Sequence, residues 1–236
     1  PVGPSPRNSF AASWRDRRVD TASPDSAGPG GPRTKGAAAV REVYADAAHL
    51  MARAEVLDRL ALGRARARHF GHLSGRVLDV ACGTGTNRRY LPAGVEYVGV
   101  DLSPEMLDRA AATIDEMAVG GTLCEMDAAS LAFADDSFDA VVSSLSTCTF
   151  PEPEAALAEM ARVCRPGGEI RLLEHGRSDV GLVNRVLDWG ADAHYDSMGC
   201  RWNQRPRALV EGAGLELETV RTGFFGLLTA MVVRPD

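Results

Sequence analysis

A glycine-rich turn between two apolar segments constrains the fold of this chain more than any other feature. Residues 77–87 read VLDVACGTGTN, in which the apolar start predicts a buried strand and Gly83 and Gly85 predict a sharp turn. Residues 97–101 read YVGVD and predict a second strand that ends on Asp101. A strand, a glycine turn, a helix and a second strand with a terminal carboxylate are typical of a nucleoside-binding α/β half-domain.

Each polar or small residue at this turn has a chemical interpretation. Gly83 and Gly85 lack a Cβ, so the backbone can bend sharply and a ligand can lie against it. A helix is expected to begin near Thr86, with its free N–H groups facing that ligand. The Asp101 carboxylate can accept hydrogen bonds from both hydroxyls of a ribose. Asp79 is unusual in a buried parallel strand, and we expect it either to hold a cationic ammonium group or to order the glycine turn.

The third position of the motif disfavours a dinucleotide ligand. The fingerprint G-x-G-x-x-G would need glycine at position 88, where this chain has Arg88. S-adenosylmethionine (SAM) carries no pyrophosphate, so it does not need the close helix approach that a third glycine allows. SAM is therefore the favoured cofactor, and an NAD-dependent oxidoreductase on a related fold is kept as an alternative.

Four motifs, in order along the chain, resemble the class I SAM-dependent methyltransferases. They read VLDVACGTG from Val77, GVDLSPEML from Gly99, CEMDAASLAFADDSFDAVVSS from Cys124 and LAEMARVCRPGGEIRLLEH from Leu157. The resemblance implies an α/β fold with a Rossmann-like seven-stranded sheet of order 3-2-1-4-5-7-6, its last strand antiparallel. It also implies helices on both faces, an N-terminal helical lid, SAM as cofactor and S-adenosylhomocysteine as product.

A narrower similarity concerns the acceptor of the methyl group. LLEHGRS from Leu172 and LDWGADAHYDSMGCRWNQR from Leu187 resemble a branch that includes thiol methyltransferases, and also bacterial phospholipid methyltransferases. Among small-molecule acceptors this slightly favours a thiol or a lipid-like compound. The reaction would be an in-line displacement, for which positioning supplies most of the catalysis. A catalytically inactive SAM-binding regulatory protein is a second alternative, because it would keep the same binding residues.

The chain of 236 residues divides into three expected segments. Residues 1–36 are rich in Pro, Gly, Ser and Arg and carry too few apolar residues to offset the entropy of ordering, so we expect a disordered tail. Residues 37–74 show helical spacing of apolar residues and are expected to form the lid. Residues 75–236 alternate strand and helix patterns and form the domain that the resemblance implies. Strands are expected at 76–81, 97–101, 122–125, 140–145, 169–174, 216–222 and 227–233, and helices at 103–117, 154–164, 180–193 and 205–212.

The cofactor is expected at the carboxyl ends of the strands, where the strand order reverses. Asp127 and Ala128 follow the third strand, and the resemblance implies that they bind the adenine, with Leu102 and Met106 flanking it. A turn-capping role for Asp127 and simple packing of Met106 and Tyr44 are the alternatives. The predicted cofactor-binding residues are Tyr44, Asp79, Ala81, Gly83, Gly85, Asn87, Asp101, Leu102, Met106, Asp127, Ala128, Ser144 and Leu145.

The acceptor is expected beside the ends of the fourth and fifth strands. His175 ends the fifth strand and is the candidate catalytic base, because its reference pKa lies near neutrality. A hydrogen bond that holds a loop is the other interpretation of His175. Trp189, His194, Cys200 and Trp202 combine aromatic surface with a few polar groups, and we expect them to bind the substrate.

A metal site is not predicted. Cys148, His175, His194 and Cys200 lack the short paired spacing that zinc sites show in a sequence. The five cysteines are dispersed and odd in number, which indicates a reducing compartment rather than a disulfide framework. Without an apolar signal segment, a cytoplasmic location is expected.

The charge pattern bears on the partners. The net charge is −6 and no basic stripe is visible, which argues against a nucleic-acid substrate. No apolar window is long enough for a membrane span. The arginine-rich helix expected at 60–70 could contact a membrane peripherally, although a solvated basic face is the simpler interpretation. The sequence leaves the oligomeric state open.

Overall fold

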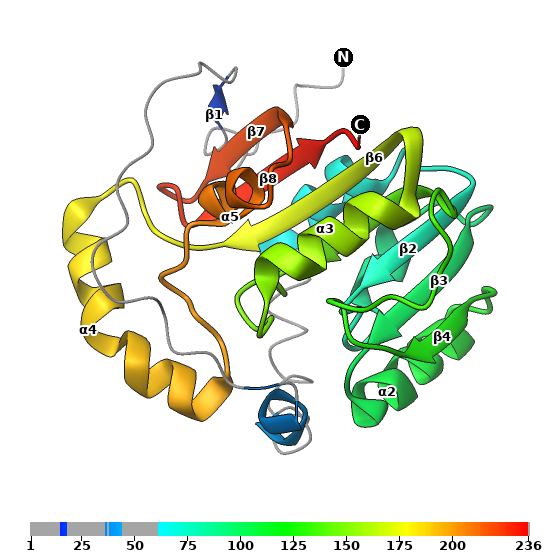
Figure 1. The fold of residues 1–236 in the computed structure, drawn as a ribbon, viewed down its shortest axis with the longest axis horizontal. Coiled ribbons are helices and arrows are strands. Elements are labelled where there is room, and N and C mark those ends of the chain that lie inside the picture. The colour runs from blue at the N-terminus through cyan, green and yellow to red at the C-terminus, as the bar shows by residue number, and fades with distance from the viewer. Residues whose placement is uncertain (1–14, 18–35, 37, 44–60, 236) are drawn as a thin grey trace, which may run out of the picture.

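One mixed sheet runs through the part of the chain that the structure describes. The computed structural model describes residues 15–17, 36, 38–43 and 61–235. Helices lie in front of and behind the sheet, and one long helix extends away from it (Figure 1). Among the described residues, no helix is both long enough and apolar enough to cross a membrane.

The strand order of the sheet is β1-β7-β8-β6-β5-β2-β3-β4. Neighbours from β4 to β6 pair in parallel, whereas β8 is antiparallel to both β6 and β7, and β1 is antiparallel to β7. Without β1, this is the predicted order 3-2-1-4-5-7-6 with its last strand antiparallel, so the predicted fold is confirmed. The strands are β1 (Arg15–Arg17), β2 (Arg76–Val80), β3 (Glu96–Asp101), β4 (Thr122–Glu125), β5 (Phe138–Ser144), β6 (Cys164–His175), β7 (Leu217–Gly223) and β8 (Leu228–Val233).

The helices follow the strands in the expected places. The start of α2 has the predicted cap, because the Ser103 hydroxyl accepts a hydrogen bond from the Met106 N–H at 3.3 Å and Pro104 occupies the first turn. Two further helical segments cover residues 38–43 and 61–70. The remaining helices are η2 (Thr86–Tyr90), α2 (Pro104–Glu116), α3 (Pro153–Val163), α4 (Gly181–Met198) and α5 (Pro206–Gly212).

Two apolar clusters cover the two faces of the sheet. Successive strand residues point to opposite faces, so Val77 and Leu78 belong to different clusters. Leu78 packs in the cluster that contains Leu157 of α3, whereas Val77 packs with Phe70 and with Ile114 of α2. Because both faces are covered, the strand residues that belong to the two clusters are apolar.

Three residues of the expected disordered tail form a strand. Arg15–Arg17 pair with Val220–Thr222 at the edge of the sheet. For these residues the structure differs from the expectation, because pairing with an edge strand satisfies backbone groups without an apolar core. The rest of 1–35 lies outside the described residues. The boundaries of tail, lid and domain therefore stay predictions.

Two elements are longer than their sequence patterns indicate. β6 begins at Cys164 rather than at residue 169, because Cys164 already pairs with Phe138. α4 continues to Met198 rather than to residue 193. It ends where Gly199 adopts a left-handed conformation with φ of 66° and donates its N–H to the Tyr195 carbonyl.

Candidate active site

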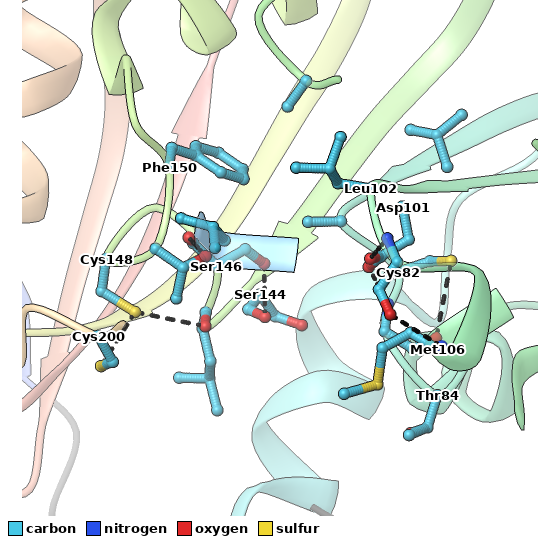
Figure 2. Close-up of a pocket in the computed structure, with 18 of the residues that line it drawn as sticks. Cys82, Thr84, Asp101, Leu102, Met106, Ser144, Ser146, Cys148, Phe150 and Cys200 are labelled. Atoms are coloured by element: carbon cyan, nitrogen blue, oxygen red, sulfur yellow. Dashed lines mark hydrogen bonds between the residues drawn. The ribbon is translucent and has the colours of Figure 1, made fainter. Parts of the chain in front are cut away.

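A cavity of about 370 Å³ opens at the carboxyl ends of the central parallel strands. Figure 2 shows its two ends, with Asp101 and Met106 at one and Cys148 and Cys200 at the other. Ser144, the last residue of β5, lies between them. The cavity therefore occupies the switch between neighbouring strands β2 and β5, where ligands of such sheets bind.

The glycine turn leaves open space on the side of the cavity. Gly83 has a φ of 55°, and a Cβ added to it would meet no atom within 4 Å. Gly85 has a φ of 75°, and its added Cβ would lie only 3.2 Å from the Cα of Ala110 in α2. Gly83 thus borders the ligand space, whereas Gly85 allows the turn to pack on α2. The helix expected at Thr86 is the short 3-10 helix η2.

Asp101 ties the glycine turn to the end of β3. Its Oδ2 accepts the N–H of Gly83 at 2.8 Å, and its Oδ1 accepts the N–H of Ser103 at 3.0 Å. Burial raises the pKa of Asp101, and hydrogen bonds from backbone N–H groups oppose that rise. The carboxylate borders the cavity, where a ribose hydroxyl could reach its remaining lone pairs.

Asp79 lies behind the cavity wall and is fully buried. Its Oδ1 accepts the Asn87 side-chain N–H at 2.8 Å, and its Oδ2 accepts the Tyr97 hydroxyl at 2.9 Å. Burial raises the pKa of Asp79 to about 6, although both hydrogen bonds lower it. Asp79 does not line the cavity. Its contacts agree with the second of its two expected roles, the ordering of the glycine turn, which it exerts through Asn87.

Arg66 is a cavity residue that the sequence reasoning missed. Its side chain is 4% exposed, and its Nη1 contacts the Asn87 Oδ1 and the Ser144 hydroxyl. Ser144 also donates to the Asn87 Oδ1 at 2.7 Å. Helical spacing is the signal that indicates the burial of Arg66, because Arg66 shares one buried helix face with Leu62 and Phe70. The expectation of a solvated basic helix is therefore wrong for Arg66.

Three distant segments bring together Cys148, His175 and Cys200 at the other end of the cavity. Cys148 follows β5, His175 ends β6 and Cys200 follows α4. The sulfur atoms of Cys148 and Cys200 are 3.3 Å apart, and the Cys200 sulfur is 3.3 Å from the His175 Nε2. Both cysteines are free thiols. This end therefore brings two thiols and an imidazole together.

These groups perturb one another. The hydrogen bond with Cys148 is the largest cause that lowers the pKa of Cys200, and the contact with His175 lowers it further. Burial lowers the pKa of His175, but the contacts with Cys200 and the charge of Glu174 outweigh it, so the net shift is upward. The arrangement favours a proton on His175 and a negative charge on Cys200.

Glu174 supports this end from inside the sheet. Its side chain is fully buried, and it accepts the N–H of Ser146 at 3.2 Å. Burial raises the pKa of Glu174 to about 7, although the neighbouring His175 opposes that rise. Glu174 does not line the cavity, so its contacts fix the loop after β5 rather than a ligand.

Most of the predicted cofactor-binding residues meet in this cavity. Asp127 also caps its own turn, because its Oδ1 accepts the Ala129 N–H at 2.9 Å. Asp79 and Gly85 lie behind the wall, and Tyr44 lies outside the described residues. The predicted residues that line the cavity are Ala81, Gly83, Asn87, Asp101, Leu102, Met106, Asp127, Ala128, Ser144 and Leu145.

Only some of the predicted catalytic and substrate-binding residues line the cavity. His175, His194 and Cys200 line the cavity. Trp202 does not, but it stacks on the His194 ring with centroids 4.0 Å apart. Trp189 is 90% exposed and lies on the outer side of α4. Other lining residues that the sequence reasoning did not assign to the site include Val40, Arg41, Arg66, Cys82, Thr84, Thr86, Met126, Phe150 and Met198.

Comparison with known proteins gives a consistent set of relatives. Residues 78–172 match the methyltransferase domain family. A phosphatidylethanolamine N-methyltransferase of Cereibacter sphaeroides is 42% identical over 125 residues, which are 52% of this chain and 62% of that protein. A demethylmenaquinone methyltransferase of Deinococcus radiodurans is 36% identical over 170 residues, which are 67% of this chain and 69% of that protein. The chain spans less than two thirds of the length of several of the relatives that it matches.

Solved structures agree on the fold. A SAM-dependent methyltransferase from Thermotoga maritima superposes with a TM-score of 0.65 at 18% identity. The superposition covers 84% of this chain and 100% of that one. At this identity the likeness concerns the arrangement of strands and helices.

Proposed function

This chain belongs to the class I SAM-dependent methyltransferases, and on that premise we propose that it transfers the methyl group of SAM to a small-molecule acceptor. One observation carries the proposal. One cavity contains both the elements around Asp101 and the thiols of Cys148 and Cys200 (Figure 2), and His175 also lines it. A methyl donor at the first end would therefore face an acceptor at the second.

The residues around Asp101, which we call the nucleoside end of the cavity, fit SAM. Gly83 leaves space where any other residue would place a Cβ, and Asp101 would accept the ribose hydroxyls. Asp127 and Ala128 would bind the adenine from the loop after β4. Arg66 offers a positive charge beside β5, where it would pair with the carboxylate of the methionine part. This pairing gives Arg66 a role that its burial alone does not explain.

Catalysis in this scheme is mainly positioning. Bound SAM supplies a methyl group on a sulfonium, which is a good leaving group. The chain aligns the acceptor with that group and limits the access of water, for which the apolar walls at Leu145 and Phe150 are suited. His175 in its neutral form would take the acceptor proton, and its contact with the Cys200 sulfur positions the imidazole at this end of the cavity.

A thiol is the acceptor that we favour. The acceptor end carries Cys148, His175 and Cys200, a polar and polarisable lining that suits a small sulfur compound. The narrower sequence similarity, to thiol methyltransferases and to phospholipid methyltransferases, agrees with a thiol or a lipid-like acceptor. A cytoplasmic location stays part of the proposal.

A lipid-like or quinone acceptor is the second candidate, and a surface feature favours it. Leu182, Val186 and Trp189 follow one another at helical spacing along α4 and are 71%, 61% and 90% exposed. Such an apolar stripe could rest on a lipid surface. Two relatives are named for phosphatidylethanolamine and demethylmenaquinone, which agrees with this alternative.

A transfer assay tests the proposal. The protein is incubated with methyl-labelled SAM and one acceptor at a time: an alkyl thiol, an aminophospholipid in mixed micelles, and a quinol. We expect label in the thiol product. Label only in the lipid or quinol would replace the favoured acceptor by the second candidate. SAM binding without transfer to any acceptor would contradict the catalytic proposal and favour a regulatory SAM-binding protein.

A further inference from the structure

Cys148, His175 and Cys200 form a compact ligand set, and we propose that they bind a thiophilic divalent cation, with Zn²⁺ as the first candidate. Each offers one ligand atom, and the three atoms lie within 4.8 Å of one another. The spacing in the sequence does not indicate this set, because His175 and Cys200 are 25 residues apart and the two cysteines are 52 residues apart. Tertiary structure, rather than a local motif, brings the three side chains together.

The distances suit tetrahedral zinc after a small adjustment. Zn–S bonds of about 2.3 Å and Zn–N bonds of about 2.0 Å place neighbouring sulfurs about 3.8 Å apart and a sulfur about 3.5 Å from a nitrogen. The Cys148–Cys200 and Cys200–His175 distances are both 3.3 Å. These two pairs would therefore move apart by about half an ångström or less on binding, whereas the ligand atoms of Cys148 and His175, within 4.8 Å of each other, would settle at about 3.5 Å. Rotation about the cysteine side-chain bonds can supply such a shift.

Outer contacts hold the three ligands in place. The Arg201 N–H donates to the Cys148 carbonyl at 3.0 Å, which joins the loop after β5 to the loop after α4. The His175 ring makes a hydrogen bond with the backbone of Trp202. The His175 carbonyl accepts the Gln204 side-chain N–H at 3.1 Å. Metal-binding histidines are commonly oriented by such a second hydrogen bond on the ring.

The site would keep one coordination position open to the cavity. Three protein ligands with a free fourth position are typical of catalytic rather than structural zinc sites. All three residues line the cavity that also contains Asp101. An exogenous ligand could therefore reach the cation from the side on which the methyl donor would lie.

The consequence for the reaction rests on the proposed function. An acceptor thiol that binds the cation loses its proton to solvent, and its sulfur keeps the electron pair as a thiolate. That pair forms the new bond from sulfur to the methyl carbon. The bond between the methyl carbon and the sulfonium breaks, and its electrons stay on the departing sulfur. The products are a methyl thioether and S-adenosylhomocysteine, and the thioether, a weaker ligand than the thiolate, leaves the cation.

Cobalt substitution tests the site on the full chain. The protein is reduced, stripped with a chelator and titrated with Co²⁺, whose visible spectrum reports tetrahedral geometry and whose charge-transfer band reports thiolate ligands. We expect one Co²⁺ per chain with both signals, displaced by one Zn²⁺. Cys148→Ser, His175→Ala and Cys200→Ser should each weaken Zn²⁺ binding by more than about 100-fold, since the loss of an outer contact alone reduces affinity by about 10- to 100-fold.

Cys124→Ser is the matched control. Cys124 lies on β4, outside the cavity, and its variant should keep the affinity for Zn²⁺. Thermal melting of each variant verifies folding. A wild-type Co²⁺ spectrum without a thiolate band, or equal Zn²⁺ affinity in the Cys148, Cys200 and Cys124 variants, would overturn the proposed site.

Calorimetry with SAM on the same samples separates the two proposals. Zn²⁺ binding without SAM binding would support the metal site and contradict the proposed function. SAM binding without any metal binding would support the proposed function and contradict the metal site. If Cys148→Ser or Cys200→Ser unfolds the chain, the wild-type Co²⁺ spectrum still decides whether thiolates bind the metal.

Discussion

The nucleoside end of the cavity is built from nearby residues through backbone contacts, whereas the acceptor end is assembled from distant segments through side chains. At the first end, Asp101 holds the N–H of Gly83, and both belong to one strand–turn–strand unit. At the second, Cys148, His175 and Cys200 come from the ends of β5, β6 and α4.

This difference predicts that mutations at the two ends have separable effects. The nucleoside end should control the affinity for SAM, and the acceptor end should control turnover. Asp79 supports the nucleoside end from behind the cavity wall, and Arg66 lies where the two ends meet. Variants of these two residues therefore test whether the two ends act separately.

His175→Ala should have the largest effect. Turnover should fall by about 100-fold or more, because a proton-transfer or ligand group is lost. The affinity for SAM should stay within about twofold of wild type, since His175 lies at the acceptor end. Steady-state kinetics with the best acceptor and SAM calorimetry measure the two quantities. His72→Ala, at a half-exposed histidine outside the cavity, is the control, and an unchanged rate in His175→Ala at every pH would remove this residue from the mechanism.

Asp79→Asn should change how stability depends on pH. The folded chain holds the pKa of Asp79 at about 6, above the value of about 4 for an unfolded aspartate, because the charged form is buried. The folded state therefore binds the proton more tightly, and the free energy of unfolding should fall by about 2–3 kcal/mol as pH rises from about 4 to about 6. Urea denaturation across this range measures it. In the variant, the free energy of unfolding should lose this dependence on pH. The same pH dependence in both proteins would contradict the raised pKa of Asp79.

Asp101→Ala should weaken SAM binding by about 10- to 150-fold, because charge-assisted hydrogen bonds of about 1.5–3 kcal/mol are lost. Turnover at saturating SAM should change much less. Asp108→Ala removes an exposed carboxylate from α2, outside the cavity, and should leave the affinity as it is. Equal affinities in the two variants would mean that Asp101 does not bind the ribose.

Arg66→Met should have the smallest effect, a loss of about tenfold in the affinity for SAM, since one charged hydrogen bond is replaced by a side chain of similar length. The affinity for adenosine, which has no carboxylate, should not change. Arg68→Met, at an exposed position of the same helix, is the control. If adenosine binding weakens as much as SAM binding, Arg66 supports the cavity wall and does not pair with the carboxylate.

The same difference between the ends explains what the sequence could predict. Residues that follow one another, such as Thr122–Glu125 of β4 or the glycine turn before η2, were predicted within a residue or two. Local chemistry decides such segments, because the turn needs glycine and the strand needs apolar residues. The sequence pattern indicates a helix from Thr86, but it does not indicate the 3-10 geometry of η2.

Residues whose roles depend on tertiary placement were harder to predict. Arg66 was assigned to a basic surface, although its helix turns it toward Asn87 and Ser144. Trp189 is expected in the acceptor pocket, but it lies on the outer side of α4, where it is 90% exposed. In both cases the residue type was informative, and the direction of the side chain was set by contacts between elements.

Calorimetric titration of SAM, S-adenosylhomocysteine and NAD into the same wild-type protein decides whether the cavity binds the methyl donor. We expect SAM and S-adenosylhomocysteine each to bind once per chain with dissociation constants in the micromolar range, on the order of −8 kcal/mol. We also expect no measurable binding of NAD, because Arg88 occupies the position of the third glycine. Binding of NAD without binding of either SAM or S-adenosylhomocysteine would contradict the account.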